Sequence, residues 1–525
     1  MKTLIINLTR MGDILQTVPL LRNLKDRGDE VHYLAVEGFD TILKTFSLVD
    51  TIHTFSVADT ISNLIENKFV TVYKKLSILL ERLKNLKFDI CINLTHTDES
   101  RYIADYLNIK DTRGIVSKMS GDRCVKNDWA NYFYVSNLNR NFNRINIIDL
   151  YNMIGDFYNT RKMISYIPDN ESLINAEKVT RGEKYFCVQL GASVESKRWS
   201  SENFIQVAEK IYNEFNIIPC FIGTKSEKEF FDKIKDKITF KCYDLFGKTS
   251  VDELAGVLKK SEFLLTNDTG TMHIAAGVGT RIIAICLATA YAHETSPYIE
   301  DSYIFEADIS CSPCSHHVQC TNPICKDMIK AEYVSDLISK LLDKKDIVVD
   351  SFNNVNVYKT YFDEYNNLRL KRLNTGKEED SINNIFYHLF MNTFKHDSYD
   401  DISQEKYIEI LRVKSDGQID KRYEADFQYL LQCFYTIERL YEGFEVSYKE
   451  KDSNKISEIA AEIEIIVKDI VNFGLAKDFI RPLTSIFQFD KENMDFTTFE
   501  EFISMNVKVN KKFIFWLKII IDLIH

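Results

Sequence analysis

The sequence predicts an α/β protein with two doubly wound halves, followed by an all-α C-terminal extension. Apolar runs typical of buried parallel strands alternate with amphipathic helical patterns over residues 3–116, and again over 185–286. After residue 345 helical patterns dominate, with little strand signal. We therefore expect domains at 1–170, 171–350 and 351–525.

Composition narrows the class of protein. The chain has 525 residues and is 45% hydrophobic, which is enough for several cores. Its net charge of −11 argues against a nucleic-acid partner. Eleven cysteines without a secretory signal, and no apolar run of membrane-spanning length, favour the cytoplasm. An inner-membrane-associated location and a homo-oligomer stay open.

The first half begins with a strand, a Gly-containing loop and a helix, which is typical of a nucleotide-binding unit. The loop lacks G-x-G-x-x-G, which disfavours a nucleotide-dependent oxidoreductase. The predicted strands are 3–8, 31–36, 88–94 and 114–116, and the predicted helices are 14–26, 39–46, 60–86 and 101–107.

The second half follows a polar, aperiodic segment at 167–183, which we expect to be a linker. The predicted strands are 185–190, 217–222, 263–265 and 281–286, and the predicted helices are 202–215, 227–237, 251–259 and 272–278. Ligands of such sheets bind at the carboxyl ends of the strands. Candidate site residues are therefore the polar ones that follow strands, at 10–13, 96–98, 193–197, 223–227 and 268–273.

The turn Asp268-Thr269-Gly270 joins a strand to a helix, where the first helical N–H groups lack intrahelical partners. These donors and the helix dipole predict a phosphate-binding site, to which Gly270 gives close access. His273 lies about one turn into the same helix. The alternative is structural: Asp268 or Thr269 caps the helix, and His273 packs in the core.

The extension carries six predicted helices, at 357–373, 382–393, 406–413, 426–442, 456–471 and 497–524. Residues 511–518 are basic and aromatic. Such a segment permits peripheral membrane contact, but its amphipathic pattern favours a buried terminal helix.

Four cysteines form a compact cluster with the spacing C-x2-C-x5-C-x4-C: Cys311, Cys314, Cys320 and Cys325. Four thiolates in one loop predict a structural Zn or Fe site, with His316 and His317 as spare ligands. Free thiols packed in a loop, or a disulfide, are the alternatives.

Three motifs together resemble glycosyltransferase family 9, the heptosyltransferases that use ADP-heptose. They are N-L-T-R-M-G-D-I-L-Q-T-V-P-L at 7–20, G-A-S followed by S-K-R-W within 191–199, and N-D-T-G-T-M-H at 267–273. The resemblance covers about residues 1–345. It implies a GT-B fold, in which two Rossmann-like domains face a cleft, with the acceptor on the first and the nucleotide sugar on the second. It also implies inversion at the anomeric carbon without an obligatory catalytic metal. A subgroup that heptosylates autotransporters carries an iron-bound cysteine finger, which the cysteine loop resembles.

The resemblance makes Asp13 the general base, whereas the structural alternative is an N-cap of helix 14–26. Lys197 would neutralise the departing diphosphate together with the 269–270 turn, unless it is a solvated surface lysine. Ser193 would donate to phosphate. Glu227 would hold ribose hydroxyls, or be an ordinary first-turn carboxylate.

The remaining assignments concern both substrates. Asp268 is expected to bind sugar hydroxyls, and His273 to support the phosphate turn. His96 and Asp98 would assist the base or bind acceptor hydroxyls, although Asp98 could equally cap a helix. Arg10 would bind an acceptor phosphate or carboxylate, or pair on the surface.

We therefore predict an inverting glycosyltransferase that transfers heptose from ADP-heptose to an acceptor hydroxyl of a lipopolysaccharide core sugar. The alternative acceptor is a protein Ser or Thr. An alternative of another class is a non-catalytic scaffold that binds a nucleotide sugar and uses the helical extension to bind partners.

Overall fold

The structure is a computed structural model that describes residues 1–315, 318, 320–349, 351–374, 379–394, 404–414 and 419–525. The chain forms two compact units. Unit 1 contains Met1–Thr95 and Ile145–Gly376, and unit 2 contains His96–Arg144 and Lys377–His525. We call 1–95 the N-terminal half of unit 1, and 145–376 its C-terminal half.

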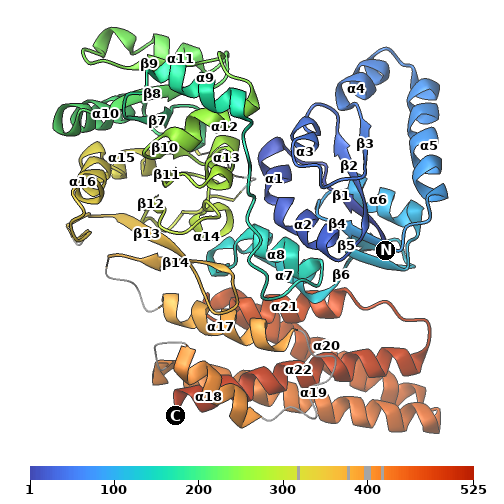
Figure 1. The fold of residues 1–525 in the computed structure, drawn as a ribbon. Helices are drawn as coiled ribbons and strands as arrows, with labels where there is room; N and C mark the ends of the chain where they lie inside the picture. The colour runs from blue at the N-terminus through green and yellow to red at the C-terminus, as the bar shows by residue number, and fades with distance from the viewer. Residues whose placement is uncertain (316–317, 319, 350, 375–378, 395–403, 415–418) are drawn as a thin grey trace. The chain divides into compact units, whose positions relative to one another are not determined.

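The N-terminal half contains a parallel sheet with the strand order β3-β2-β1-β4. Its strands are apolar because helices cover the sheet, as in other doubly wound folds (Figure 1). The strands are β1 Lys2–Ile6, β2 Glu30–Val36, β3 Thr51–Phe55 and β4 Ile90–Asn93. The helices are α1 Met11–Gln16, α2 Val18–Asp26, α3 Thr41–Lys44, α4 Val57–Ile65 and α5 Phe69–Asn85.

The C-terminal half contains an eight-stranded sheet with the order β14-β13-β12-β11-β10-β7-β8-β9. The strands from β12 to β9 are parallel, and β13 and β14 add antiparallel pairs at one edge. The strands are β7 Tyr185–Gln189, β8 Ile218–Ile222, β9 Tyr243–Asp244, β10 Leu264–Asn267, β11 Ile282–Cys286, β12 Tyr303–Ala307, β13 Val355–Phe362 and β14 Leu368–Arg372.

Helices cover both faces of this sheet. Figure 1 shows α10 and α16 on one face, and α12 and α13 on the other. Phe186, Trp199 and Phe305 lie in the core cluster between the sheet and its helices. The helices are α8 Ile147–Ile154, α9 Asn170–Thr180, η2 Glu195–Lys197, α10 Ser201–Phe215, α11 Lys228–Asp232, η3 Lys235–Lys237, α12 Val251–Lys260, α13 Gly270–Val278, α14 Ala292–Thr295, α15 Cys325–Met328 and α16 Ala331–Leu342.

Unit 2 is mainly helical, with one antiparallel strand pair. The side chains of Phe513 and Trp516 in its last helix are buried, so the predicted buried terminal helix is confirmed. None of the helices in the described ranges is long and apolar enough to cross a membrane. The elements are α6 Asp98–Leu107, β5 Asp111–Ser117, β6 Arg123–Lys126, α7 Asp128–Leu138, η1 Arg140–Phe142, α17 Glu379–Thr393, α18 Gln404–Lys414, η4 Lys421–Tyr423, α19 Glu424–Glu450, α20 Ser453–Ala476, α21 Arg481–Glu492 and α22 Phe499–Ile524.

Five sequence predictions about these elements are wrong. Predicted helix 60–86 is two helices, α4 and α5, separated at Asn67, whose φ of 59° is left-handed. Predicted helix 227–237 is the short helix α11 followed by the 3-10 helix η3. The segment 357–373 is not a helix, because its β-branched and aromatic residues pair with β12 and turn back at 363–367 to form β14. The expected linker at 167–183 contains α9, which Asp169 caps by accepting the Ser172 N–H. Predicted helix 14–26 is two helices that meet at Thr17, two residues before Pro19, which has no N–H to continue the ladder.

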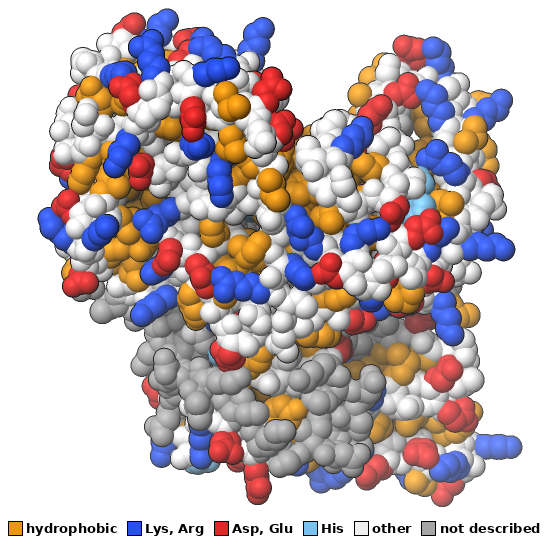
Figure 2. Space-filling model, viewed as in Figure 1, with side chains coloured by type: hydrophobic (Ala, Val, Ile, Leu, Met, Phe, Trp, Pro, Cys, Tyr) orange, Lys and Arg blue, Asp and Glu red, His pale blue; other side chains and the backbone are white. Residues whose placement is uncertain are grey.

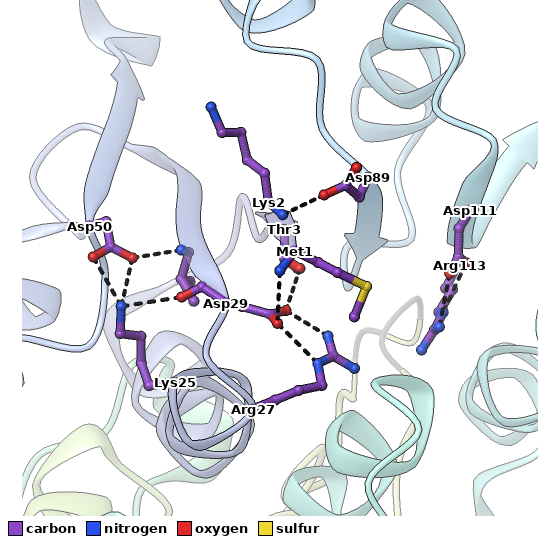
Figure 3. A network of polar contacts seen from close by, with 11 residues as sticks. Met1, Lys2, Thr3, Lys25, Arg27, Asp29, Asp50, Asp89, Asp111 and Arg113 are labelled. Atoms are coloured by element: carbon purple, nitrogen blue, oxygen red, sulfur yellow. Dashed lines mark hydrogen bonds and ion pairs between the residues drawn. The ribbon is translucent and has the colours of Figure 1, made fainter.

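An ion-pair network lies at the amino ends of the parallel strands, opposite the edge where ligands bind (Figure 3). Asp29 precedes β2 and accepts hydrogen bonds from the Thr3 hydroxyl at 2.7 Å and from Arg27 Nη2 at 2.6 Å. Asp50 accepts from Lys25 at 2.8 Å and from the Val31 N–H at 2.7 Å. Burial opposes ionisation of Asp29, but Arg27 and Thr3 hold its pKa below the ordinary value. The network therefore connects the strands at the end of the sheet away from the candidate site.

Candidate active site

The first turn of α1 carries Asp13. Arg10 is the N-cap residue, and its backbone N–H donates to the Asp13 carboxylate at 3.3 Å. Asp13 is therefore the third residue of α1, and the N-cap role suggested for it is wrong. Burial raises the pKa of Asp13, and the negative charge of Asp268 raises it further, while Lys197 opposes this effect. Such a carboxyl group is suited to accept a proton.

The first turn of α13 lies directly against that of α1. A Cβ atom added to Gly12 would stand 3.6 Å from Gly270 Cα, so the two backbones approach closely because both residues lack side chains. Thr269 is the N-cap of α13 and makes no side-chain capping bond within the described part of the chain. The first N–H groups of α13 therefore receive no cap from the Thr269 side chain.

Lys197 and Asp268 form an ion pair with 2.8 Å between Nζ and Oδ2. Their side chains are only 18% and 10% exposed. Burial would raise the pKa of Asp268, but the charge and hydrogen bond of Lys197 hold it below the ordinary value. Lys197 is thus not the solvated surface lysine of the alternative interpretation. Its positive charge lies beside the first turn of α13.

Asn267 is a positioning residue that the sequence analysis left without a role. Its side chain is fully buried and donates to the carbonyl oxygens of Leu190 and Gly191, at 3.1 and 3.0 Å. Its amide oxygen accepts the Trp199 N–H at 3.0 Å. One amide therefore holds both ends of the loop that carries Ser193 and Lys197. Its place at the end of β10, inside the recognised motif, was the only signal in the sequence.

Gln16 is a second residue that the sequence analysis missed. Its amide Nε2 donates to Nε2 of His273 at 2.9 Å, and both side chains are buried. Burial lowers the pKa of His273 to about 4, so the ring is neutral at neutral pH. This bond joins α1 of one half to α13 of the other. His273 is thus a hydrogen-bonded core histidine that also lies one turn from Thr269.

A cavity of about 1100 Å³ is lined by both halves of unit 1. The N-terminal half contributes Arg10 and Asp13, and the C-terminal half contributes Ser193 and Lys197. Phe39 adds an apolar wall. Four of the predicted site residues are thus brought to one cavity that is large enough for a nucleotide sugar.

Glu227 lies beside this loop. Its carboxylate accepts the Thr224 N–H at 2.7 Å and the Thr224 hydroxyl at 2.9 Å. A Cβ atom added to Gly191 would stand 1.6 Å from Glu227 Oε1, so the carboxylate occupies the space that only a glycine leaves. Glu227 is the N-cap residue of α11 and makes no side-chain capping bond in the described structure.

His96 and Asp98 belong to unit 2. His96 accepts the Asn137 amide N–H at 3.0 Å, and burial lowers its pKa to about 4. Asp98 is the first residue of α6, whose cap is Thr97, so the capping alternative for Asp98 is wrong. Arg123 donates to Asp98 at 2.7 Å and holds its pKa below the ordinary value. Asp98 is therefore ionised and paired with an arginine.

The cysteine loop lies against the end of β11, where the Cys314 N–H donates to the Ala288 carbonyl at 2.8 Å. Burial raises the pKa of the Cys325 thiol, and the neighbouring Cys311 and Cys320 raise it further. Among the described residues, no three His, Cys, Asp or Glu side chains are grouped to hold a metal ion. The suggested spare ligands His316 and His317 lie outside the described residues.

Two doubly wound halves that line one cavity define the GT-B fold, which confirms the predicted fold class. Residues 77–324 match the family described as "Glycosyltransferase family 9 (heptosyltransferase)". The chain is similar to that family over this segment, and it is a glycosyltransferase. The matched segment includes Lys197 and Asp268, while Asp13 precedes it.

Known proteins of this kind resemble the chain at low identity. Lipopolysaccharide heptosyltransferase 1 of Campylobacter coli is 24% identical over 307 residues, which cover 55% of this chain and 84% of that protein. Lipopolysaccharide core heptosyltransferase OpsX of Haemophilus influenzae is 21% identical over 303 residues, which cover 56% and 81%. The crystal structure of the glycosyl transferase family 9 protein from Veillonella parvula has a TM-score of 0.53 at 17% identity and covers 66% of this chain and 98% of that one. At this identity the structural likeness shows the fold.

Proposed function

We propose that this glycosyltransferase transfers a heptose from ADP-heptose to a hydroxyl of a lipopolysaccharide core sugar, with inversion at the anomeric carbon. The observation that carries the proposal is the meeting of Asp13 and Lys197 at one cavity. A proton acceptor and a cation that can neutralise a diphosphate are the two groups that this transfer requires. The heptosyltransferase names of the relatives support the choice of sugar.

In the proposed reaction Asp13 accepts the proton of the acceptor hydroxyl while the oxygen attacks the anomeric carbon. The bond from that carbon to the diphosphate oxygen breaks, and ADP leaves with the electron pair. Lys197 and the first N–H groups of α13 stabilise the negative charge that develops on the diphosphate. Burial raises the pKa of Asp13, which supports its role as the base.

The other predicted roles complete the proposal. Ser193 donates to phosphate, Glu227 binds the ribose hydroxyls and Asp268 binds sugar hydroxyls. Arg10 lines the same cavity and binds the acceptor. His96 and Asp98 remain proposed acceptor-side residues. In this division of roles, residues 1–170 bind the acceptor and 171–350 bind the nucleotide sugar.

We also propose a structural Zn or Fe ion at the four cysteines. The support for this site is the compact spacing of the four cysteines, C-x2-C-x5-C-x4-C, within one loop. Metal analysis of the purified protein should find near-stoichiometric Zn or Fe. The double variant Cys320→Ser/Cys325→Ser should lose it. A metal-free wild-type protein would end this part of the proposal.

A two-stage experiment tests the function. A thermal-shift screen of nucleoside diphosphates and their sugars should show the largest stabilisation with ADP and ADP-heptose, because a specific ligand stabilises the folded state. ADP release is then measured with a soluble core-oligosaccharide acceptor and, in parallel, with a Ser/Thr peptide. NMR of the product reports the anomeric configuration. ADP release with the peptide alone would show that the acceptor is a protein Ser or Thr and not a core sugar. Retention of the anomeric configuration would overturn the inverting mechanism.

A further inference from the structure

The helices α4 and α5 expose a row of large apolar side chains that the rest of unit 1 does not cover. No residue of α4 is buried, and Leu83 is the one buried residue of α5. The apolar hairpin surface, as we call it, consists of Ile65, Phe69, Val70, Tyr73 and Ile78, whose exposed fractions are 76%, 60%, 67%, 72% and 70%. Single exposed apolar residues are ordinary, but five within 14 residues indicate an interaction surface.

The hairpin is also positively charged within an acidic protein. Residues 57–87 contain six Lys or Arg and three Asp or Glu, a net charge of +3, whereas the whole chain has −11. Figure 2 shows basic, acidic and hydrophobic side chains intermixed on the part of the surface that carries α4 and α5. Lys75 pairs with Asp59 and Lys68 with Glu66, and Lys74 is exposed. The partner of this surface is therefore expected to be both apolar and anionic.

The same hairpin reaches the catalytic cavity. Val57, Ala58 and Ile61 of α4 line the cavity that Asp13 and Lys197 also line. The apolar hairpin surface begins one helical turn further along the chain, at Ile65. A partner bound to this surface would therefore lie beside the cavity that Asp13 lines.

We infer that the apolar hairpin surface docks the enzyme on an anionic lipid bilayer. Large apolar side chains enter the boundary between headgroups and acyl chains, and lysines attract the anionic headgroups. A two-fold interface between two copies of the chain is disfavoured, because it would bring two net-positive surfaces together. The inference rests on the proposed function in one respect: docking there would present a lipid-linked acceptor to the cavity.

The test uses the full chain and vesicles of phosphatidylcholine, with or without phosphatidylglycerol. The wild-type protein should co-sediment with the anionic vesicles, and less so as salt increases. The variant Ile65→Ser/Phe69→Ser/Val70→Ser should bind them at least tenfold more weakly. The matched control Val446→Ser/Ile465→Ser/Leu475→Ser removes three other exposed apolar side chains, in α19 and α20, and should bind like the wild type. Lys74→Glu/Lys75→Glu should weaken binding to the anionic vesicles only.

Three results would overturn the inference. The first is equal binding of the wild-type protein to neutral and anionic vesicles, and the second is unchanged vesicle binding by the hairpin variant. The third is a wild-type protein that binds no vesicles but is an oligomer in light scattering, while the hairpin variant is a monomer. A thermal-shift control shows whether the variant is folded. Transfer to a soluble acceptor separates this inference from the proposed function. The hairpin variant should keep that transfer, and a wild-type protein that binds vesicles but transfers no sugar would contradict the function alone.

Discussion

Removing the Lys197 charge should destabilise the protein in a pH-dependent way. Lys197→Met leaves the Asp268 carboxylate without the ammonium group that now lies 2.8 Å away. Both side chains are largely buried, at 18% and 10% exposure, so the carboxylate cannot recover its hydration. Loss of one partner of a buried pair costs about 3 kcal/mol when some solvent access remains. For a domain of this size, that lowers the thermal midpoint by roughly 6 °C or more.

The pH dependence follows from the pKa of Asp268. In the wild type, the lowered pKa means that the ion pair contributes stability above the unfolded-state pKa of about 3.9. That contribution disappears as the pH falls through the still lower folded-state value. In Lys197→Met, uncompensated burial raises the pKa of Asp268, so the carboxyl group takes up a proton at a higher pH. The deficit in thermal midpoint should therefore be full at pH 7.5 and smaller at pH 5.

Differential scanning fluorimetry from neutral to acidic pH measures this effect. Lys197→Met/Asp268→Asn, which removes both charges, should regain most of the lost stability. The control Lys340→Met breaks a more exposed pair with Asp336, 2.7 Å apart and 27% and 41% exposed, and should cost about 1 kcal/mol or less. A Lys197→Met protein as stable as the control variant, or a deficit that does not change with pH, would refute the reasoning.

Other changes test the remaining contacts of the site. Asp13→Asn should lower kcat by about 100- to 10,000-fold without changing the calorimetric affinity for ADP, and a loss below tenfold would contradict the role as base. In the wild type, kcat/KM should fall as the pH falls through the Asp13 pKa, which burial raises above 3.8. Gln16→Ala removes the hydrogen bond to buried His273 and should cost about 1–3 kcal/mol in thermal unfolding, whereas an unchanged midpoint would argue against this contact. Gly191→Ala places a methyl group where Glu227 lies and should lower ADP affinity about tenfold if Glu227 binds ribose, a change of about 1.4 kcal/mol.

Local sequence patterns predicted the strands and helices that carry the site. The strand and helix around Asp268 appear as β10 and α13, because an apolar run, a polar turn and a following helical pattern are encoded within a few residues. The helix predicted at 357–373 was wrong for the opposite reason. The segment instead forms the strands β13 and β14, and β13 pairs with β12, which lies some fifty residues earlier in the chain.

Local sequence patterns also could not predict which distant segments group into one unit. Residues 96–144 group with 377–525 in unit 2, where the Asn131 amide donates to Asp490 at 2.8 Å and the Val125 N–H donates to Asn493 at 2.9 Å. Hydrogen bonds between residues more than 300 positions apart leave no periodic signal in either segment. The predicted boundaries at 170 and 350 stay a prediction.

The sequence by itself determined the α/β class, the order of the elements and the motifs at the strand ends, because these depend on hydrophobic period and turn chemistry over short distances. Only the tertiary structure decided which polar groups meet. It pairs Lys197 with Asp268, joins Gln16 to His273 and lets Asn267 hold the loop of Lys197. The physical reason is that the pKa of a carboxyl group and the role of an amide depend on burial and on neighbours that come from distant parts of the chain.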